Sequence, residues 1–238
     1  ATLNYRVMEL CYEHMNNPVR VAIEPEKAVV DEVTQILYHV GQHEKFNLLL
    51  GLMKQEAGEK VLIFSNTKVE CEILEWKLNH NGFNAGQISG DLHQRARIKV
   101  LEKFQEGELD ILIATDVASR GLHIDNITHV INYDLPQDAE DYVHRIGRTA
   151  RAGNKGTAIT LCCEDFAQHL DRVEDYLKDK IPVAWPEEGL FLEEKEGTPP
   201  RRKRRGPPKA KPDNRRPHTG RPPRRRPHSR GRELARTR

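Results

Sequence analysis

The stretch Val61-Leu62-Ile63-Phe64-Ser65-Asn66-Thr67-Lys68 places four apolar residues directly before four polar ones. A continuous run of β-branched and aliphatic residues is typical of a strand that is buried on both faces of a parallel sheet. Three further runs of this kind follow along the chain, at Ile111–Thr115, Val130–Tyr133 and Ala158–Leu161. The sequence therefore predicts several strands that lie inside a sheet.

Segments with helical periodicity lie between these runs, at about residues 67–80, 93–105, 138–147 and 166–179. Alternation of buried strands and helices with short connections is typical of a doubly wound α/β fold. We therefore expect a mostly parallel sheet, with helices on both faces, over residues 34–182.

The first 24 residues follow a different pattern. Val7, Leu10, Cys11 and Met15 fall on one helical face, and a short strand is expected at Val19–Ile23. Residues 25–33 have the mixed charge of a linker. Residues 1–24 are either an extension packed on the same domain or the end of a preceding domain. The chain begins at Ala1, which suggests a fragment, and in that case this helical face is expected to be poorly covered.

Charge divides the chain unevenly. Residues 199–238 hold 17 Lys and Arg against 2 Asp and Glu, a net charge of +15, whereas the preceding 198 residues carry a net charge of −13. The basic segment also contains 9 of the 14 prolines and no aromatic residue, so it cannot bury enough apolar surface to order itself. Residues 183–238 are therefore expected to form a disordered tail that binds polyanions from residue 199 onward.

The four cysteines form no C-x-x-C pair, so neither a metal site nor a disulfide framework is expected. The most apolar run, residues 46–53, is too short to cross a bilayer, and no signal peptide is found. We expect a soluble, cytoplasmic protein without a bound metal of its own.

The segment His144-Arg145-Ile146-Gly147-Arg148-Thr149-Ala150-Arg151-Ala152-Gly153 gives the strongest functional signal. If it is helical, His144, Arg148 and Arg151 lie on one face. Guanidinium groups match phosphate oxygens and stay charged at any working pH. The spacing predicts a site for a highly charged anion.

This segment resembles motif VI of the DEAD-box helicases of superfamily 2, which reads H-R-I-G-R-T-x-R-A-G. Further segments that resemble motifs of the family follow in the expected order: motif IV at 61–68, the Q-x-x-R element at Gln94 and Arg97, motif V at 114–121 and the N-Y-D-L-P segment at 132–136. Ala1-Thr2 resembles the end of the S-A-T motif that closes the first domain of the family. The resemblance covers about residues 1–180. It implies that residues 34–182 are the C-terminal RecA-like domain of an ATP-dependent RNA helicase, that 25–33 link two domains, and that 1–24 are the remnant of the preceding one.

The resemblance also implies roles for individual residues. Arg148 and Arg151 correspond to arginine fingers that reach the ATP phosphates from across a domain cleft, and His144 to a residue that links nucleotide state to RNA contact. The nucleotide-binding part of motif V corresponds to Asp116, Gly121, His123 and Asp125, with His123 standing where most members have Asp. Contacts to the RNA backbone are implied for Ser65, Asn66, Thr67, Lys68, Gly90, Gln94, Arg97, Thr115 and Arg120. Thr67 is also expected to cap the helix that follows it.

Two sequence features that ATP hydrolysis requires in this family are missing from the 238 residues, namely a G-x-x-x-x-G-K-[ST] phosphate loop and a D-E-A-D segment. ATP and Mg²⁺ are therefore expected to be held mainly by an N-terminal domain, and this chain alone is expected to be inactive.

Three alternatives remain at this point. One is a superfamily 2 DNA helicase of the RecQ type, which the H-R-I-G-R-T sequence disfavours. Another is a non-catalytic RNA-binding or scaffold module that acts through the basic tail and a protein partner. The last is a docking role alongside catalysis, because some bacterial members of the family join an RNA-degrading assembly with ribonuclease E.

Overall fold

The computed structural model describes residues 5–16, 19, 32–119, 124, 126–150 and 155–199. The chain divides into two units, residues 1–199 and 200–238, and the second, which holds most of the predicted basic tail, lies outside the described residues. The short strand expected at Val19–Ile23 and most of the linker expected at 25–33 also lie outside them.

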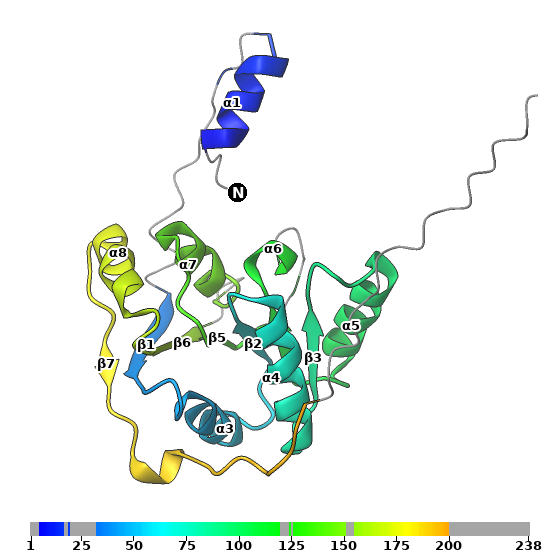
Figure 1. Ribbon diagram of the computed structural model, residues 1–238, viewed down its shortest axis with the longest axis vertical. Coiled ribbons are helices and arrows are strands. Elements are labelled where there is room, and N and C mark those ends of the chain that lie inside the picture. The colour runs from blue at the N-terminus through cyan, green and yellow to red at the C-terminus, as the bar shows by residue number, and fades with distance from the viewer. Residues whose placement is uncertain are drawn as a thin grey trace, which may run out of the picture. The chain divides into compact units, whose positions relative to one another are not determined.

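A seven-stranded parallel sheet forms the centre of the first unit. Its strands are β1 (Val33–His39), β2 (Val61–Phe64), β3 (Ala85–Ile88), β4 (Ile111–Ala114), β5 (His129–Asn132), β6 (Gly156–Cys162) and β7 (Val183–Ala184). They are arranged in the order β3-β4-β2-β5-β6-β1-β7, and the labelled strands follow this order from right to left in Figure 1.

Helices cover both faces of this sheet. They are α3 (Lys45–Gln55), α4 (Lys68–His80), α5 (Gln94–Glu106), α6 (Asp116–Ser119), α7 (Ala139–Ile146) and α8 (Ala167–Leu177). Neighbouring residues of one strand point to opposite faces, so Ile63 joins the core under α3 and α4, whereas Leu62 joins the core under α5 and α6. A third apolar cluster packs α7 and α8 against β1 and β6.

The predicted doubly wound α/β fold is confirmed. The four predicted strands correspond to β2, β4, β5 and β6, and the four predicted helical segments to α4, α5, α7 and α8. The burial of all four residues of both β2 and β4 explains why continuous apolar runs mark these strands.

Residues 185–199, which we call the C-terminal strap, lie on the first unit instead of belonging to the tail that the sequence predicts from residue 183. The strap follows β7 and passes along α3 toward α4, as the yellow and orange segment in Figure 1 shows. Leu190, Phe191 and Leu192 pack against the core cluster of α3 and α4. The Leu192 amide donates to the carbonyl of Asn47 at 3.1 Å. The described fold therefore extends beyond the predicted boundary, because these apolar residues, an ion pair of 2.7 Å between Lys77 and Glu194 and a bond from the N–H of Lys195 to Asn81 join the strap to α3 and α4.

Helix α1 (Tyr5–His14) accounts for the helical pattern found near the N-terminus. Leu10 is 47% exposed and Met15 is 56% exposed, as expected for a poorly covered face, while the side chain of Val7 lies outside the described residues. No helix within the described ranges is long and apolar enough to cross a bilayer.

Candidate functional site

The carboxyl edge of the sheet, where the parallel strands end, brings three of the predicted segments together. Phe64, the last residue of β2, pairs with Ala114 of β4 on one side and with Asn132 of β5 on the other. The turns that follow these three strands are therefore neighbours, although they are far apart in the sequence. Ligands of open α/β sheets bind at this edge.

Arg145 of α7 joins these turns. Its guanidinium forms two bonds of 2.7 Å with the carboxylate of Asp116, through Nε to Oδ1 and through Nη2 to Oδ2. It also donates to Oδ1 of Asn66 at 2.9 Å and to the carbonyl of Asp134 at 2.6 Å, and it lies over the ring of Phe64. Arg145 is only 1% exposed, whereas the side chain of Asp116 is 21% exposed, so the guanidinium is buried and its carboxylate partner is partly open to water. One buried side chain therefore connects motifs IV, V and VI of the sequence.

Asp134 extends this network to α3. Its Oδ1 accepts a bond of 2.7 Å from Nζ of Lys45, and its Oδ2 accepts bonds from Oγ of Ser65 at 2.6 Å and from the backbone N–H of Asn66 at 3.0 Å. Ser65 is fully buried, so the expectation that it contacts RNA is corrected. Its hydroxyl instead stabilises the turn from within, because it donates to a buried carboxylate.

The N-terminus of α4 shows the predicted cap. Oγ1 of Thr67 accepts a bond of 3.1 Å from the backbone N–H of Glu70. The next side chain, Lys68, is half exposed and forms an ion pair of 2.8 Å with Asp91, beside Gly90. Burial raises the pKa of Glu70, and the nearby carboxylate of Asp134 raises it further. The turn thus presents a helix N-terminus and an ammonium group at the carboxyl edge.

The Q-x-x-R element lies at the start of α5, which begins at Gln94. Nη2 of Arg97 donates to the carbonyl of Ala118 in α6 at 2.6 Å, so this arginine ties α5 to the turn after β4. Among the described residues, Nε of Arg97 and Oγ of Ser89 are buried without a hydrogen-bond partner. Thr115 follows β4 and is buried, and its carbonyl accepts from the first turn of α6.

Motif VI does not form one continuous helix. Helix α7 ends at Ile146, and Gly147 is its C-cap residue. Arg148 and Thr149 continue in tight turns, with bonds from their N–H groups to the carbonyls three residues earlier, and Ala150 has a φ of 53°. The expectation that His144 and Arg148 share a face of one helix is therefore corrected, because α7 ends at Ile146 and the N–H group of Arg148 bonds three residues back instead of four.

The turn that carries Arg148 is fixed by hydrogen bonds of the next residue, Thr149. Thr149 is fully buried, and its hydroxyl lies 2.7 Å from the carbonyl of Ile127 and 2.9 Å from that of Thr128. Gly156 at the start of β6 leaves room for this contact, since an added Cβ would overlap both Thr149 and the backbone of Ala150. His144 lies in the last turn of α7, with Nδ1 3.7 Å from Oδ1 of Asp141.

Five of the predicted site residues lie outside the described residues, namely Arg120, Gly121, His123, Asp125 and Arg151. Asp116 is described, and its carboxylate, predicted to face the nucleotide, is bonded to Arg145. The described ranges contain no group of three or more His, Cys, Asp or Glu side chains that is able to hold a metal ion.

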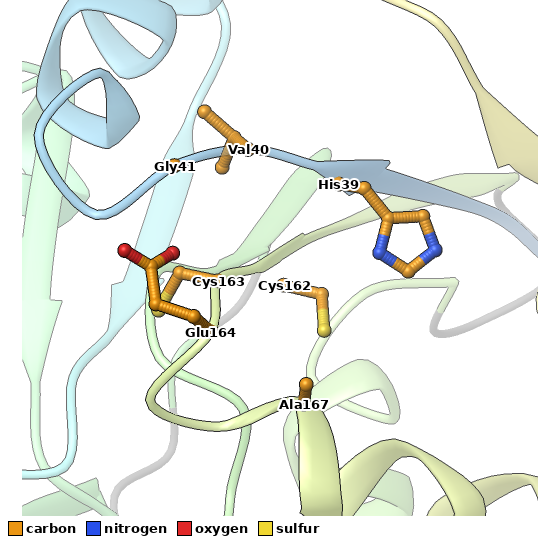
Figure 2. A pocket seen from close by; sticks show the side chains of 7 residues that line it. All are labelled: His39, Val40, Gly41, Cys162, Cys163, Glu164 and Ala167. Atoms are coloured by element: carbon orange, nitrogen blue, oxygen red, sulfur yellow. The ribbon is translucent and has the colours of Figure 1, made fainter.

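A hollow at the ends of β1 and β6 lies apart from the predicted residues. Figure 2 shows the side chains that line it: His39, Val40, Gly41, Cys162, Cys163, Glu164 and Ala167. Burial raises the pKa of Cys162 to about 11, so its thiol stays protonated at neutral pH. The carboxylate of Glu164 accepts bonds from the backbone N–H of Gln42. None of the predicted site residues lines this hollow.

Three residues of the network were not singled out from the sequence. Lys45 directly precedes an apolar run in the sequence, where an ordinary surface lysine is expected, and its partner Asp134 is 89 residues away. Arg145 cannot be distinguished from its neighbouring arginines by sequence alone. The one available signal for Asp134 was its place directly after a buried strand, where functional polar residues of α/β folds gather.

Comparison with known protein families gives a match to the helicase conserved C-terminal domain over residues 44–153. The ATP-dependent RNA helicase RhlB of Shewanella baltica (strain OS155) is 50% identical over 184 residues, which cover 77% of this chain and 42% of that protein. RhlB of Shewanella sp. (strain ANA-3) is 48% identical over 194 residues, covering 82% of this chain and 44% of the relative. The chain thus spans less than half the length of these curated relatives.

The chain is also similar to solved structures of related proteins. The E. coli DEAD-box protein SrmB, bound to the regulator of ribonuclease activity RraA, has a TM-score of 0.63 at 32% identity and is covered over 98% of its chain by 70% of this one. S. cerevisiae Dbp5, bound to RNA and ADP BeF3, has a TM-score of 0.66 at 30% identity, with 78% of this chain and 49% of Dbp5 covered.

Proposed function

This chain belongs to the DEAD-box family of RNA helicases and carries the C-terminal helicase domain, and from this premise we propose that it completes the ATP site of an RNA-dependent ATPase. Arg148 and Arg151 act as arginine fingers on ATP that a second RecA-like domain holds. The carboxyl edge of the sheet binds the RNA backbone. Closure of the two domains bends the bound strand and separates short duplexes locally.

The observation that carries this proposal is the set of bonds made by Arg145. Because its guanidinium contacts Asp116, Asn66 and the carbonyl of Asp134, the nucleotide-facing and RNA-facing segments are fixed to one another. A movement of α7 toward a nucleotide is therefore accompanied by a movement of the turns after β2 and β4. This network supports the proposal that ATP binding and RNA binding to the domain are energetically coupled.

We assign Arg148 and Arg151 to the nucleotide-facing side of the domain as arginine fingers, together with the other residues of motifs V and VI predicted there, namely His144, Asp116, Gly121, His123 and Asp125. Guanidinium groups fit phosphate oxygens and stabilise the charge that develops during phosphoryl transfer. The phosphate loop, the D-E-A-D carboxylates and Mg²⁺ belong to the other domain, so this chain does not hydrolyse ATP alone.

The RNA-facing side consists of Asn66, Thr67, Lys68, Gly90, Gln94, Arg97, Thr115 and Arg120. The capped start of α4 and the Lys68 ammonium suit a phosphate group, and Gly90 lets a backbone approach closely. The buried Nε of Arg97 has no partner among the described residues, and an RNA oxygen is able to supply one after a small movement. These contacts address the backbone and are independent of base sequence.

The relatives suggest a cellular setting. RhlB of S. baltica is similar to 77% of this chain, and SrmB was solved in complex with a regulator of ribonuclease activity. We extend the proposal to RNA turnover in the cytoplasm, with ribonuclease E and its RNA-degrading assembly as the partner. Capture of purified ribonuclease E by the immobilised chain tests this extension.

The function is tested by joining residues 1–238 to the N-terminal part of S. baltica RhlB that the chain does not match. We expect no ATP hydrolysis from the chain alone, and RNA-stimulated hydrolysis with unwinding of a short RNA duplex from the fused two-domain protein. A folded fusion that binds RNA but does not hydrolyse ATP contradicts the proposal. Equal stimulation by DNA favours a DNA helicase instead.

Removal of residues 199–238 is expected to weaken RNA binding at low salt and to leave the fold intact. The segment carries a net charge of +15, and each lost phosphate contact flattens the dependence of log affinity on log salt by about 0.7 for a single strand. Affinity measured at several salt concentrations, with circular dichroism for the fold, tests this. A variant with the same tail residues in scrambled order is the control and should bind like the parent. An unchanged affinity and slope after truncation refute the role of the tail.

A further inference from the structure

Lys45, the first residue of α3, carries an ammonium group that is removed from water. Its exposed fraction is 0%, and its Nζ lies 2.7 Å from Oδ1 of Asp134, which is itself buried. Burial of a charged pair costs several kcal/mol per ion, and replacement of such pairs by apolar residues is often neutral or stabilising. Stability alone therefore does not explain why a lysine occupies this position.

The surroundings of Lys45 fix its ammonium in place. Nζ lies 4.3 Å from the centre of the Tyr133 ring and 5.2 Å from that of Phe166, and it is 3.7 Å from Sγ of Cys163. These neighbours follow β5 and β6 at the carboxyl edge. Burial together with the charge of Glu70 raises the pKa of Tyr133, so its hydroxyl remains neutral beside the pair.

The pair acts on the turn between β2 and α4 through Asp134. One carboxylate oxygen faces Lys45, and the other accepts from the Ser65 hydroxyl and the Asn66 N–H. The side chain of Asn66 is then held by the carbonyl of Leu135 and by Arg145. The direction in which the chain enters α4 is thus set by a carboxylate whose charge Lys45 balances.

We propose that Lys45 is a positioning residue that orients the β2–α4 turn for contact with an RNA phosphate. It does not touch the ligand, but acts through Asp134 on residues 65–68. This inference rests on the RNA-binding role proposed above for that turn, and it adds a residue of α3, outside every segment that the sequence singled out.

Hydrogen exchange of the 238-residue chain, followed by mass spectrometry with and without a single-stranded oligouridylate, tests this inference. Lys45→Met leaves Asp134 as an unpaired buried charge and risks unfolding, so Lys45→Met/Asp134→Asn, which removes both charges, is the main variant. Lys54→Met is the matched control, because it makes the same change at an exposed position of the same helix. Peptides from residues 156–162 of β6 report on the rest of the fold.

In the double variant we expect exchange of residues 65–70 to be about fivefold faster than in the parent, because bonds to a carboxylate become weaker bonds to an amide. Exchange of 156–162 is expected to stay unchanged, and the protection of 65–70 by RNA to be lost. The control should behave as the parent. Unchanged exchange at 65–70, or equal acceleration throughout the chain, overturns the inference.

The two proposals fail in different ways. If RNA gives no protection at 65–70 in the parent chain, the RNA-binding role of this turn is wrong. Exchange in the absence of RNA still decides whether Lys45 orients the turn.

Discussion

Replacement of Arg148 by alanine in the fused two-domain protein is expected to lower RNA-stimulated ATP turnover by at least about 10³-fold. The reason is that an arginine finger stabilises the charge that develops on the phosphoryl group in the transition state, and so lowers the activation barrier. Arg148→Lys should recover little, because an ammonium is a point charge and cannot reproduce the planar fork of a guanidinium. Steady-state hydrolysis at saturating RNA and ATP measures the effect.

The fold and RNA affinity should change little in these variants, since Arg148 lies in a turn after α7 whose position is fixed by the buried Thr149. Arg172→Ala, at an exposed position of α8, is the control and should keep full turnover. Turnover of the Arg148→Ala protein within a few-fold of the parent excludes the proposed role.

The second large effect is expected at Arg145. Arg145→Met should lower the free energy of unfolding of the chain by about 3–5 kcal/mol, because it leaves Asp116 without its cationic partner and the carbonyl of Asp134 without a donor. Urea denaturation followed by circular dichroism gives this quantity. Arg172→Met should change it by less than about 0.5 kcal/mol.

A double variant separates the ion pair from general packing. If the Arg145–Asp116 pair carries the loss, Arg145→Met/Asp116→Asn should be less destabilised than the sum of the two single variants. Strict additivity, or a cost for Arg145→Met no larger than for Arg172→Met, shows that the network does not hold the carboxyl edge together.

The fold was predictable mainly where burial on both faces leaves a continuous apolar run. β2 and β4 have such runs and were found, whereas β3 (Ala-Gly-Gln-Ile) lies at an edge of the sheet, contains a half-buried glutamine, and was not singled out. The C-terminal strap was assigned to the tail because five glutamates surround its three packed apolar residues. Local composition does not reveal that the apolar residues of such a segment pack against the core cluster of α3 and α4.

The candidate site was predictable at the level of segments and less so at the level of side chains. Sequence spacing placed Thr67 correctly as a helix cap. It placed His144 and Arg148 on one helical face, but Gly147 ends the helix between them. Ser65 and Asp116 look like ligand-binding residues in a motif, yet they bond to buried partners that lie 69 and 29 residues away. Such long-range pairs depend on the register of the parallel sheet, which a single sequence does not contain.

The central claim is that this domain acts on the transition state of phosphoryl transfer on ATP bound by another domain. The most direct test is the affinity of the fused protein, with RNA and Mg²⁺ present, for ADP with aluminium fluoride compared with a non-hydrolysable ATP analogue. We predict that Arg148→Ala/Arg151→Ala weakens binding of the aluminium fluoride complex by about 10²-fold or more and changes binding of the ATP analogue far less. Equal weakening of both ligands, or of neither, contradicts the account.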